Sequence, residues 1–216
     1  IPSNKAVAFN KTIKYGLYEI EKVQDESWAK PKDLIILADK LVEDTMEKSR
    51  VTKYKKIREL SSKDLDNIIL SHPFSDLEGS ENFWDYSVPL VEAEHVTEET
   101  GTGFVHIAPS HGQDDYELAS KNGIEAPFMI DDEGKYLPNV KIFSGKKVYN
   151  NDGSYGDGNG AVIKELINCN ALFAKGKLRH QYPHSWRSKA PLLFRNTLSG
   201  SFRWRKMILE QNLYLK

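Results

Sequence analysis

The stretch that decides the interpretation of this chain is Gly101-Thr-Gly-Phe-Val-His-Ile-Ala-Pro-Ser-His-Gly-Gln-Asp-Asp-Tyr116. It opens with two glycines that let the backbone turn sharply and approach another group closely. A short apolar strand follows, then a turn that carries a second histidine. Two adjacent carboxylates come last, as is typical of the first turn of a helix. This order can gather two imidazoles and a carboxylate around one small volume.

The residues alone leave three uses of this stretch open. In the first, Asp114 caps the helix while His106 packs in the core with a hydrogen-bond partner. In the second, His106, His111 and Asp115 bind a metal ion, although their spacing matches no common zinc motif. In the third, they line a pocket for a polar small molecule. Asp115 would then bind a cation, and His106 would shape or polarise the site.

The bulk composition is that of an ordinary globular domain. The 216 residues are 39% hydrophobic and 28% charged, with a net charge of -1. This balance gives no argument for a nucleic-acid partner. The single cysteine, Cys169, excludes a disulfide framework and a cysteine-rich zinc site. No apolar run is long enough to span a membrane. The chain begins Ile1-Pro2 without a methionine, so we expect a piece of a longer protein.

Hydrophobic patterns predict many short strands with intercalated helices. Strands are expected at 5–9, 15–20, 86–91, 104–107, 177–182 and 190–195, and helices at 33–46, 114–122, 161–173 and 202–216. Residues 51–60 and 63–70 are ambiguous, 131–134 form a hairpin turn, and 150–160 form a flexible loop. Pro89 predicts an edge or bulged strand. Strict alternation of strand and helix is absent, which favours an α+β fold with a barrel-like or mixed sheet.

Four segments taken together resemble the editing domain of isoleucyl-tRNA synthetases. The stretch quoted first is similar to that family's editing signature. The others, in the family's order, are Ile1-Pro-Ser-Asn-Lys-Ala-Val-Ala8, Asp131-Asp-Glu-Gly-Lys-Tyr-Leu-Pro138 and Tyr182-Pro-His-Ser-Trp-Arg-Ser-Lys-Ala-Pro-Leu-Leu-Phe-Arg195. The resemblance implies an editing domain over residues 1–197, with 198–216 as a tail or linker toward an absent synthetic domain.

The resemblance also implies a fold and an activity. The fold is a β-barrel-like α+β editing domain with peripheral helices. The activity is hydrolysis of valine wrongly esterified to tRNA(Ile), because one methylene supports only modest discrimination at a synthetic site. His106 and the order His-Gly-x-Asp-Asp favour the isoleucyl branch over the valyl and leucyl branches. Those branches, and a non-catalytic RNA-binding module, are the alternatives.

By resemblance, two side chains are the catalytic candidates. Asp115 anchors the α-ammonium group of the substrate, and His106 lines the amino-acid pocket and excludes isoleucine. Hydrolysis is expected to use a positioned water, with help from the terminal hydroxyls of the tRNA. The substrate-binding set is completed by Thr102, Gly103, Phe104 and Asn4. His111 and Asp114 are expected to shape the turn and the helix start.

The resemblance implies neither a cofactor nor a metal for this chain, because ATP and Mg²⁺ belong to the absent synthetic site. Ser185 and Ser188 stand where several relatives carry cysteines, so no thiolates are available for zinc. The implied partners are the 3′ end of tRNA(Ile) and the catalytic and anticodon-binding domains of the parent chain, in the cytoplasm. A basic cluster, Lys53, Lys55, Lys56 and Arg58, is either a solvated face or a phosphate contact.

Overall fold

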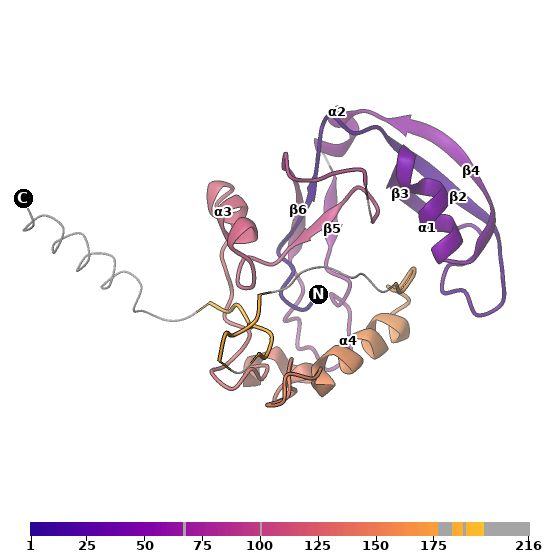
Figure 1. The fold of residues 1–216 in the computed structure, drawn as a ribbon. Coiled ribbons are helices and arrows are strands. Elements are labelled where there is room, and N and C mark those ends of the chain that lie inside the picture. Colours follow the sequence, from indigo (N-terminus) through magenta and orange to yellow (C-terminus); the bar gives the residue numbers. More distant parts are fainter. Residues whose placement is uncertain (67, 100, 177–182, 188, 197–216) are drawn as a thin grey trace, which may run out of the picture.

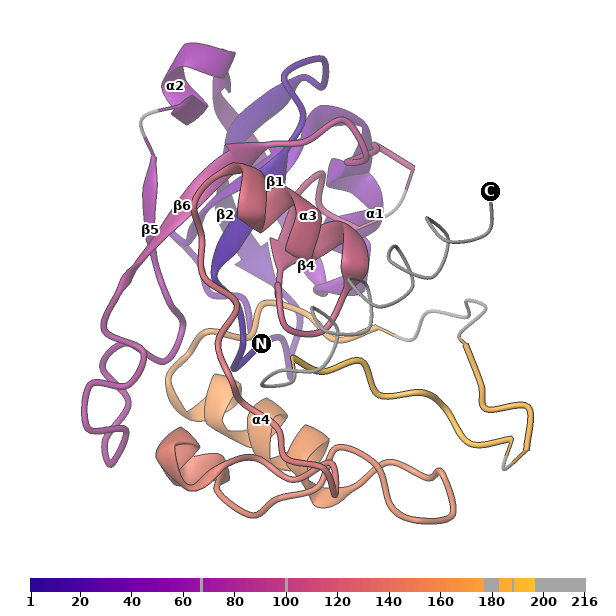
Figure 2. The same ribbon diagram turned by 90° about the vertical axis from the view of Figure 1, so that its left-hand side faces the viewer.

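The computed structural model describes residues 1–66, 68–99, 101–176, 183–187 and 189–196. Two β-sheets form the upper part of the molecule, and helix α4 (Asp157–Asn168) runs below them (Figures 1 and 2). The N-terminus lies near the middle, between these two parts (Figure 1). Among the described residues, no helix is both long and apolar enough to cross a membrane.

The four-stranded sheet carries the histidine of the opening stretch. Its strand order is β5 (Ile69–Ser71), β6 (Ser87–Glu92), β1 (Ala6–Phe9) and β7 (Val105–Ile107). Strand β1 is parallel to β6 and antiparallel to β7, with Val7 opposite His106. Helix α3 (Gln113–Lys121) packs on this sheet through Ala119, which is buried with Ala6 and Ile107. This packing places the start of α3 next to the end of β7.

The three-stranded sheet is antiparallel and lies beside the first. Its order is β3 (Leu34–Ala38), β2 (Tyr15–Val23) and β4 (Val51–Leu60), followed along the chain by α2 (Ser62–Asp66). A 3-10 helix (Asp39–Leu41) and α1 (Val42–Lys48) connect β3 to β4. Tyr15 links the two sheets, because its ring contacts those of Phe9 and Phe104. The sheets therefore share one aromatic junction.

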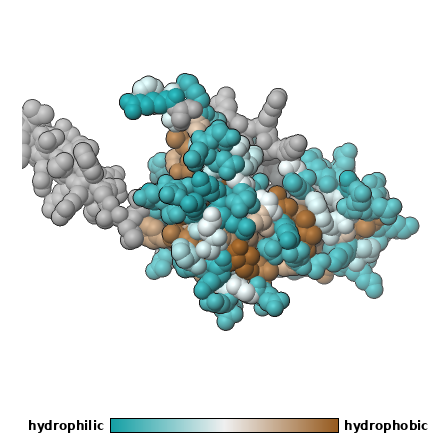
Figure 3. Space-filling model, turned by 90° about the horizontal axis from the view of Figure 1, so that it is seen from below, coloured by the Kyte–Doolittle hydropathy of each residue, from teal (hydrophilic) through white to brown (hydrophobic). Residues whose placement is uncertain are grey.

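The lower part has its own core. Trp84, Phe74 and Phe143 are fully buried there, and α4 adds Val162 and Leu166. The Trp84 Nε1–H group donates to the carbonyl oxygen of Pro2 at 2.9 Å, so the core also holds the first residues of the chain. A 3-10 segment (Pro138–Phe143) covers this core. Seen from below, the molecule shows hydrophobic residues between hydrophilic ones (Figure 3).

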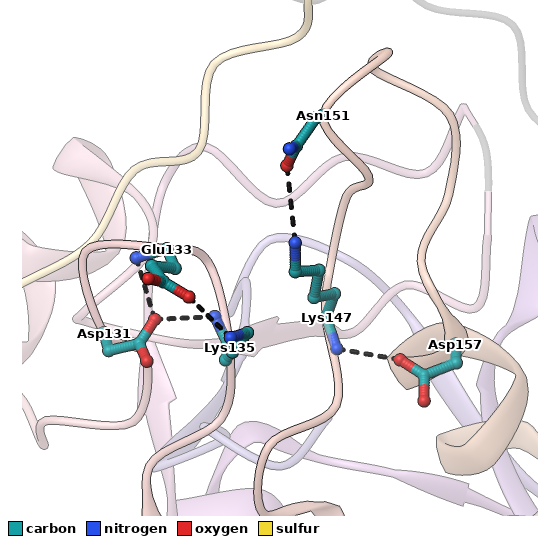
Figure 4. A network of polar contacts seen from close by, with 6 residues as sticks. All are labelled: Asp131, Glu133, Lys135, Lys147, Asn151 and Asp157. Atoms are coloured by element: carbon teal, nitrogen blue, oxygen red, sulfur yellow. Dashed lines mark hydrogen bonds and ion pairs between the residues drawn. The ribbon is translucent and has the colours of Figure 1, made fainter.

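Two polar turns belong to the lower part, and the second of them lies at the start of α4 (Figure 4). The Asp131 carboxylate accepts hydrogen bonds from the backbone amides of Glu133 and Lys135, both at 2.9 Å. The Asp157 carboxylate accepts from the backbone amide of Lys147 at 2.8 Å. Short aspartate side chains satisfy backbone donors of this kind in turns. The hairpin turn expected at 131–134 is confirmed by the bridge between Ile130 and Tyr136.

The α+β class is confirmed. The strands expected at 5–9, 15–20 and 104–107 and the helix expected at 114–122 are present. Gly123 has the left-handed φ of 68° that ends a helix. The barrel-like expectation has only loose support, because the described strands form two open sheets rather than a closed barrel.

The helix predicted at 33–46 is partly wrong. Residues Leu34–Ala38 form β3, and only Val42–Lys48 form an α-helix. The apolar positions 34, 37, 38, 41 and 42 fit helical spacing, yet Ile35 and Ile36 pair with Tyr18 and Leu17 of β2. Sheet pairing of β-branched residues outweighed the local pattern.

The edge or bulged strand predicted from Pro89 is also wrong, because β6 lies between β5 and β1 and pairs with both without a register shift. The parallel pairing with β1 begins only at Leu90, one residue after the proline. Pro89 therefore lies beside the start of that ladder, where a missing N–H group costs no bond to β1.

Three further predictions concern the second half of the chain. The flexible loop predicted at 150–160 is wrong in its last residues, because α4 begins at Asp157. The strand predicted at 190–195 is wrong, since only an isolated bridge between His184 and Pro191 forms there. The strand at 177–182, the helix at 202–216 and the tail at 198–216 lie outside the described residues.

Candidate functional site

Ala108 makes two hydrogen bonds that close the turn between β7 and α3. The backbone N–H group of Ala108 donates to Asp115 Oδ2 at 2.8 Å. The carbonyl oxygen of Ala108 accepts from the backbone N–H group of His111 at 2.9 Å. Asp115 lies in the first turn of α3, where a carboxylate is favoured by the helix dipole. The sequence thus fixes the carboxylate directly after the strand that carries His106.

His106 is exposed on β7, in the segment where Ile107 is buried against α3. Alternation along the strand directs the two side chains to opposite faces. Surrounding protein nevertheless lowers the pKa of His106, because a charged imidazolium is poorly solvated there, while the nearby Asp115 charge opposes the shift. The lowered pKa favours the neutral ring, and no other described side chain hydrogen-bonds to it.

His111 uses both ring nitrogens. Nδ1 is 2.8 Å from the carbonyl oxygen of Phe194, and Nε2 is 2.8 Å from Ser3 Oγ. A carbonyl only accepts, so Nδ1 carries the proton and Nε2 accepts from the Ser3 hydroxyl. Burial lowers the pKa of His111, which favours this neutral form.

The metal interpretation of the opening stretch loses support from these contacts. Both nitrogens of His111 and one oxygen of Asp115 are already bonded within the protein. Within the part of the chain that the structure describes, no group of three histidine, cysteine or carboxylate side chains could hold a metal ion.

Asn4 is buried next to the strand that carries His106. With its nitrogen turned toward the protein, the side-chain amide donates to the carbonyl oxygens of Ala6 and Ile107 at 2.7 and 3.2 Å. The carbonyl oxygen of Asn4 accepts from the Tyr86 hydroxyl at 2.7 Å. Asn4 therefore holds β1 and β7 together at the site.

The Gly-Thr-Gly loop before β7 is fixed to the three-stranded sheet by its carbonyl oxygens. The Thr102 oxygen accepts from the Ala38 N–H group at 3.0 Å, and the Gly103 oxygen accepts from the Tyr15 hydroxyl at 2.7 Å. The Gly101 oxygen accepts from the Thr45 hydroxyl at 3.1 Å. Phe104 stacks on Tyr15, with ring centroids 4.7 Å apart.

The structure thus divides the expected site residues into two groups along β7. The charge of Asp115 acts on both His106 and His111, so these three are close together. Thr102 and Gly103 lie at the other end of the strand, where they contact β2 and β3. Sequence reasoning missed the partners that hold both groups, namely Ser3, Tyr15 and Thr45. Of these, only Ser3 stood in a segment that the resemblance had singled out.

The basic cluster of β4 is paired with carboxylates. Lys53 contacts Glu21 and Lys55 contacts Glu19, both on the neighbouring β2, at 2.7 and 3.0 Å. The two others pair likewise: Lys56 with Asp39 at 2.7 Å, and Arg58 with Asp64 at 3.1 Å. These pairs favour a solvated face over a phosphate contact, since each cation already has a counter-charge.

Two larger cavities are lined by other residues. One, of about 550 Å³, is lined by Trp28, Arg50 and Phe173 among others. The other, of about 660 Å³, is lined by residues of the 131–133 turn together with Arg195. Neither includes His106 or Asp115.

Comparison with known proteins shows that the chain is similar to one segment of the isoleucine–tRNA ligases. No protein-family model matches it. The isoleucine–tRNA ligases of Bradyrhizobium diazoefficiens and Caulobacter vibrioides are 44% and 42% identical to it over 206 residues. These alignments include 91% of this chain and 20% and 21% of the two ligases. The chain therefore spans about a fifth of the length of the relatives it matches.

A solved structure agrees in fold. A crystal structure described as GlLeuRS-CP1, a connective-peptide domain, superposes with a TM-score of 0.50 at 16% sequence identity. The match includes 82% of each chain. At this identity the likeness concerns the fold alone.

Proposed function

We propose that this chain, a homologue of a segment of the isoleucine–tRNA ligases, is their editing module and hydrolyses valine esterified to tRNA(Ile). A synthetic site that binds isoleucine separates it from valine by a single methylene, which gives only limited discrimination. A second site that rejects the larger side chain and hydrolyses the smaller ester corrects the error. The chain is the candidate for that second site.

The observation that carries the proposal is the placement of Asp115 beside His106. Asp115 Oδ2 is held by the Ala108 amide, while its other oxygen makes no hydrogen bond with a described residue. That oxygen can accept from the α-ammonium group of an aminoacyl ester, as an ionised acceptor facing a charged donor. The ester carbonyl is then held at a fixed distance from the carboxylate.

His106 gives the site its size limit in this proposal. The neutral ring presents a flat, weakly polar wall rather than a charge, because its pKa is lowered by poor solvation. Valine fits against this wall, and isoleucine, with one more methylene, does not. Thr102, Gly103 and Phe104 shape the far wall, and Asn4 holds the strand that carries His106.

Water is the only co-reactant of the hydrolytic step. A water molecule attacks the ester carbonyl, the bond to the ribose oxygen breaks, and the tRNA leaves with its hydroxyl restored. The terminal hydroxyls of the tRNA assist, and the protein supplies position. The partners are the 3′ end of tRNA(Ile) and the remaining domains of a ligase, in the cytoplasm. No cofactor is required, and ATP and Mg²⁺ serve the synthetic site elsewhere in such a ligase.

The test is a deacylation assay on the intact ligase that contains this chain. We expect valyl-tRNA(Ile) to be hydrolysed and isoleucyl-tRNA(Ile) to be largely spared. Hydrolysis of a valine or leucine ligase's own misacylated tRNA instead would point to those branches. Binding of tRNA without hydrolysis of any ester would indicate a non-catalytic RNA-binding module.

Replacing His106 by alanine should weaken the size limit. The preference for the valyl over the isoleucyl ester should fall by roughly 10-fold or more, since one methylene is worth about 1–3 kcal/mol in a fitted pocket. The measurement is the ratio of kcat/KM for the two esters. Val105→Ala, at an exposed neighbour on the other face of β7, is the matched control. An unchanged ratio in His106→Ala would contradict the role of His106.

A further inference from the structure

We propose that His111 is a positioning residue of this site, which fixes the turn that aims Asp115 without touching the substrate. For its kinetic consequences the proposal rests on the proposed function. The hydrogen bonds on which it depends can be tested without any substrate.

The backbone of the turn links His111 to Asp115 through Ala108. The N–H group of His111 donates to the carbonyl oxygen of Ala108 at 2.9 Å. The N–H group of the same Ala108 donates to Asp115 Oδ2 at 2.8 Å. The two bonds lie on either side of the Ala108 Cα atom, so a shift of His111 displaces the residue whose N–H group holds the carboxylate. The two bonds make the position of Asp115 depend on that of His111.

The ring of His111 joins the turn to two distant segments. Its partners, Ser3 and Phe194, are 108 and 83 residues away along the chain. Ser3 is buried, so its hydroxyl is held in place by its surroundings. Long-range contacts on two sides of one ring fix it more firmly than a local turn could, because neither partner moves with the turn.

The backbone that follows Ser3 leads to the strand of His106. The Lys5 N–H group, two residues after Ser3, donates to the carbonyl oxygen of Ile107 at 2.9 Å. From there the chain enters β1, where Val7 is opposite His106. His111 thus holds the segment that runs along the strand of His106, as well as the turn of Asp115. Both proposed substrate contacts depend on it.

The ring cannot itself act on a substrate while these contacts last. Its proton lies on Nδ1 and is donated to Phe194, and the lone pair of Nε2 accepts from Ser3. His111 therefore differs from His106, to whose ring no other described side chain hydrogen-bonds.

The kinetic test compares His111→Ala, His111→Gln and Asp114→Asn in the intact ligase. Asp114 is the control, because it is exposed and adjoins Asp115 in the same helix turn. His111→Ala should lower kcat for valyl-tRNA(Ile) hydrolysis by roughly 10- to 100-fold, as expected for a small misplacement of a reacting group. KM should stay within about twofold, because most tRNA contacts are intact. Glutamine carries an N–H donor group and an acceptor oxygen, as the ring does, and should restore part of kcat.

A second readout needs no substrate. Amide hydrogen exchange of the segment 104–116 should become faster in His111→Ala and stay unchanged in Asp114→Asn, while exchange of β2 and β4 stays unchanged in both. A wild-type ligase that hydrolyses no ester would refute the proposed function, and exchange would still decide the role of His111. Unchanged exchange at 104–116, or a kcat within about twofold of wild type, overturns the positioning role. A general rise in exchange together with a fall in kcat indicates a merely structural role and overturns it too.

Discussion

Replacing Asp115 by asparagine should lower kcat/KM for valyl-tRNA(Ile) hydrolysis by roughly 10- to 100-fold. A hydrogen bond between charged partners is worth about 1.5–3 kcal/mol, and each 1.4 kcal/mol corresponds to a factor of ten. The substitution separates the two tasks of the side chain. Asparagine keeps an oxygen that can accept from the Ala108 N–H group, so the turn is retained, but it loses the charge that faces the ammonium group.

The matched control is Asp114→Asn, which makes the same chemical change one residue earlier, at an exposed position. We expect hydrolysis within about twofold of wild type for this variant, because surface charges contribute little. The rate of isoleucine attachment, measured on the same preparations, reports whether the ligase remains folded. An Asp115→Asn variant that hydrolyses the ester as fast as Asp114→Asn would remove the ammonium anchor from the proposal.

Replacing Gly103 by alanine should reduce the free energy of unfolding by about 2–5 kcal/mol. Gly103 has a φ of 82°, which costs a side chain about 1–2 kcal/mol. A Cβ atom there would overlap that of Ala38 and lie 3.3 Å from the Ala38 Cα atom and 3.1 Å from Tyr15 Cε1. Since Ala38 and Tyr15 are buried, the clash adds about 1–3 kcal/mol.

Gly101→Ala isolates the backbone contribution. Gly101 has nearly the same φ, 83°, but a Cβ atom there meets nothing within 4 Å. Its expected cost is therefore only the about 1–2 kcal/mol of the left-handed backbone. Urea denaturation of the two variants and the wild type measures the difference. Equal destabilisation by the two alanines would mean that the contact with Ala38 relaxes without cost.

Local sequence patterns predicted those strands and helices whose structure depends mainly on residues close by in the sequence. The glycine-to-aspartate order of the opening stretch gave both β7 and α3, since a strand of alternating apolar residues and a helix with acids in its first turn are local features. The prediction failed at 34–38, where five apolar residues fit a helix and a strand equally well. Pairing with β2, which is not visible in the spacing, decided for the strand.

The candidate site, too, was predicted only in part from the sequence. The residue types and the family resemblance named His106 and Asp115 as candidates, and the structure places them on adjoining elements. The partners of His111 could not be predicted, because Ser3 and Phe194 are far away in sequence and a carbonyl oxygen carries no residue signature. The packing role of Gly103 against Ala38 was hidden for the same reason.

The sequence by itself determined the α+β class, the order of the chemically important residues and the family whose segment the chain resembles. These follow from local periodicity and from residue identity, which are present in any conformation of the chain. Only the tertiary structure decided which side chains are free to meet a substrate. His106 and one oxygen of Asp115 are available, whereas His111 is held by two distant segments. Hydrogen bonds between residues more than eighty positions apart form only when the sheets and the core bring those residues together.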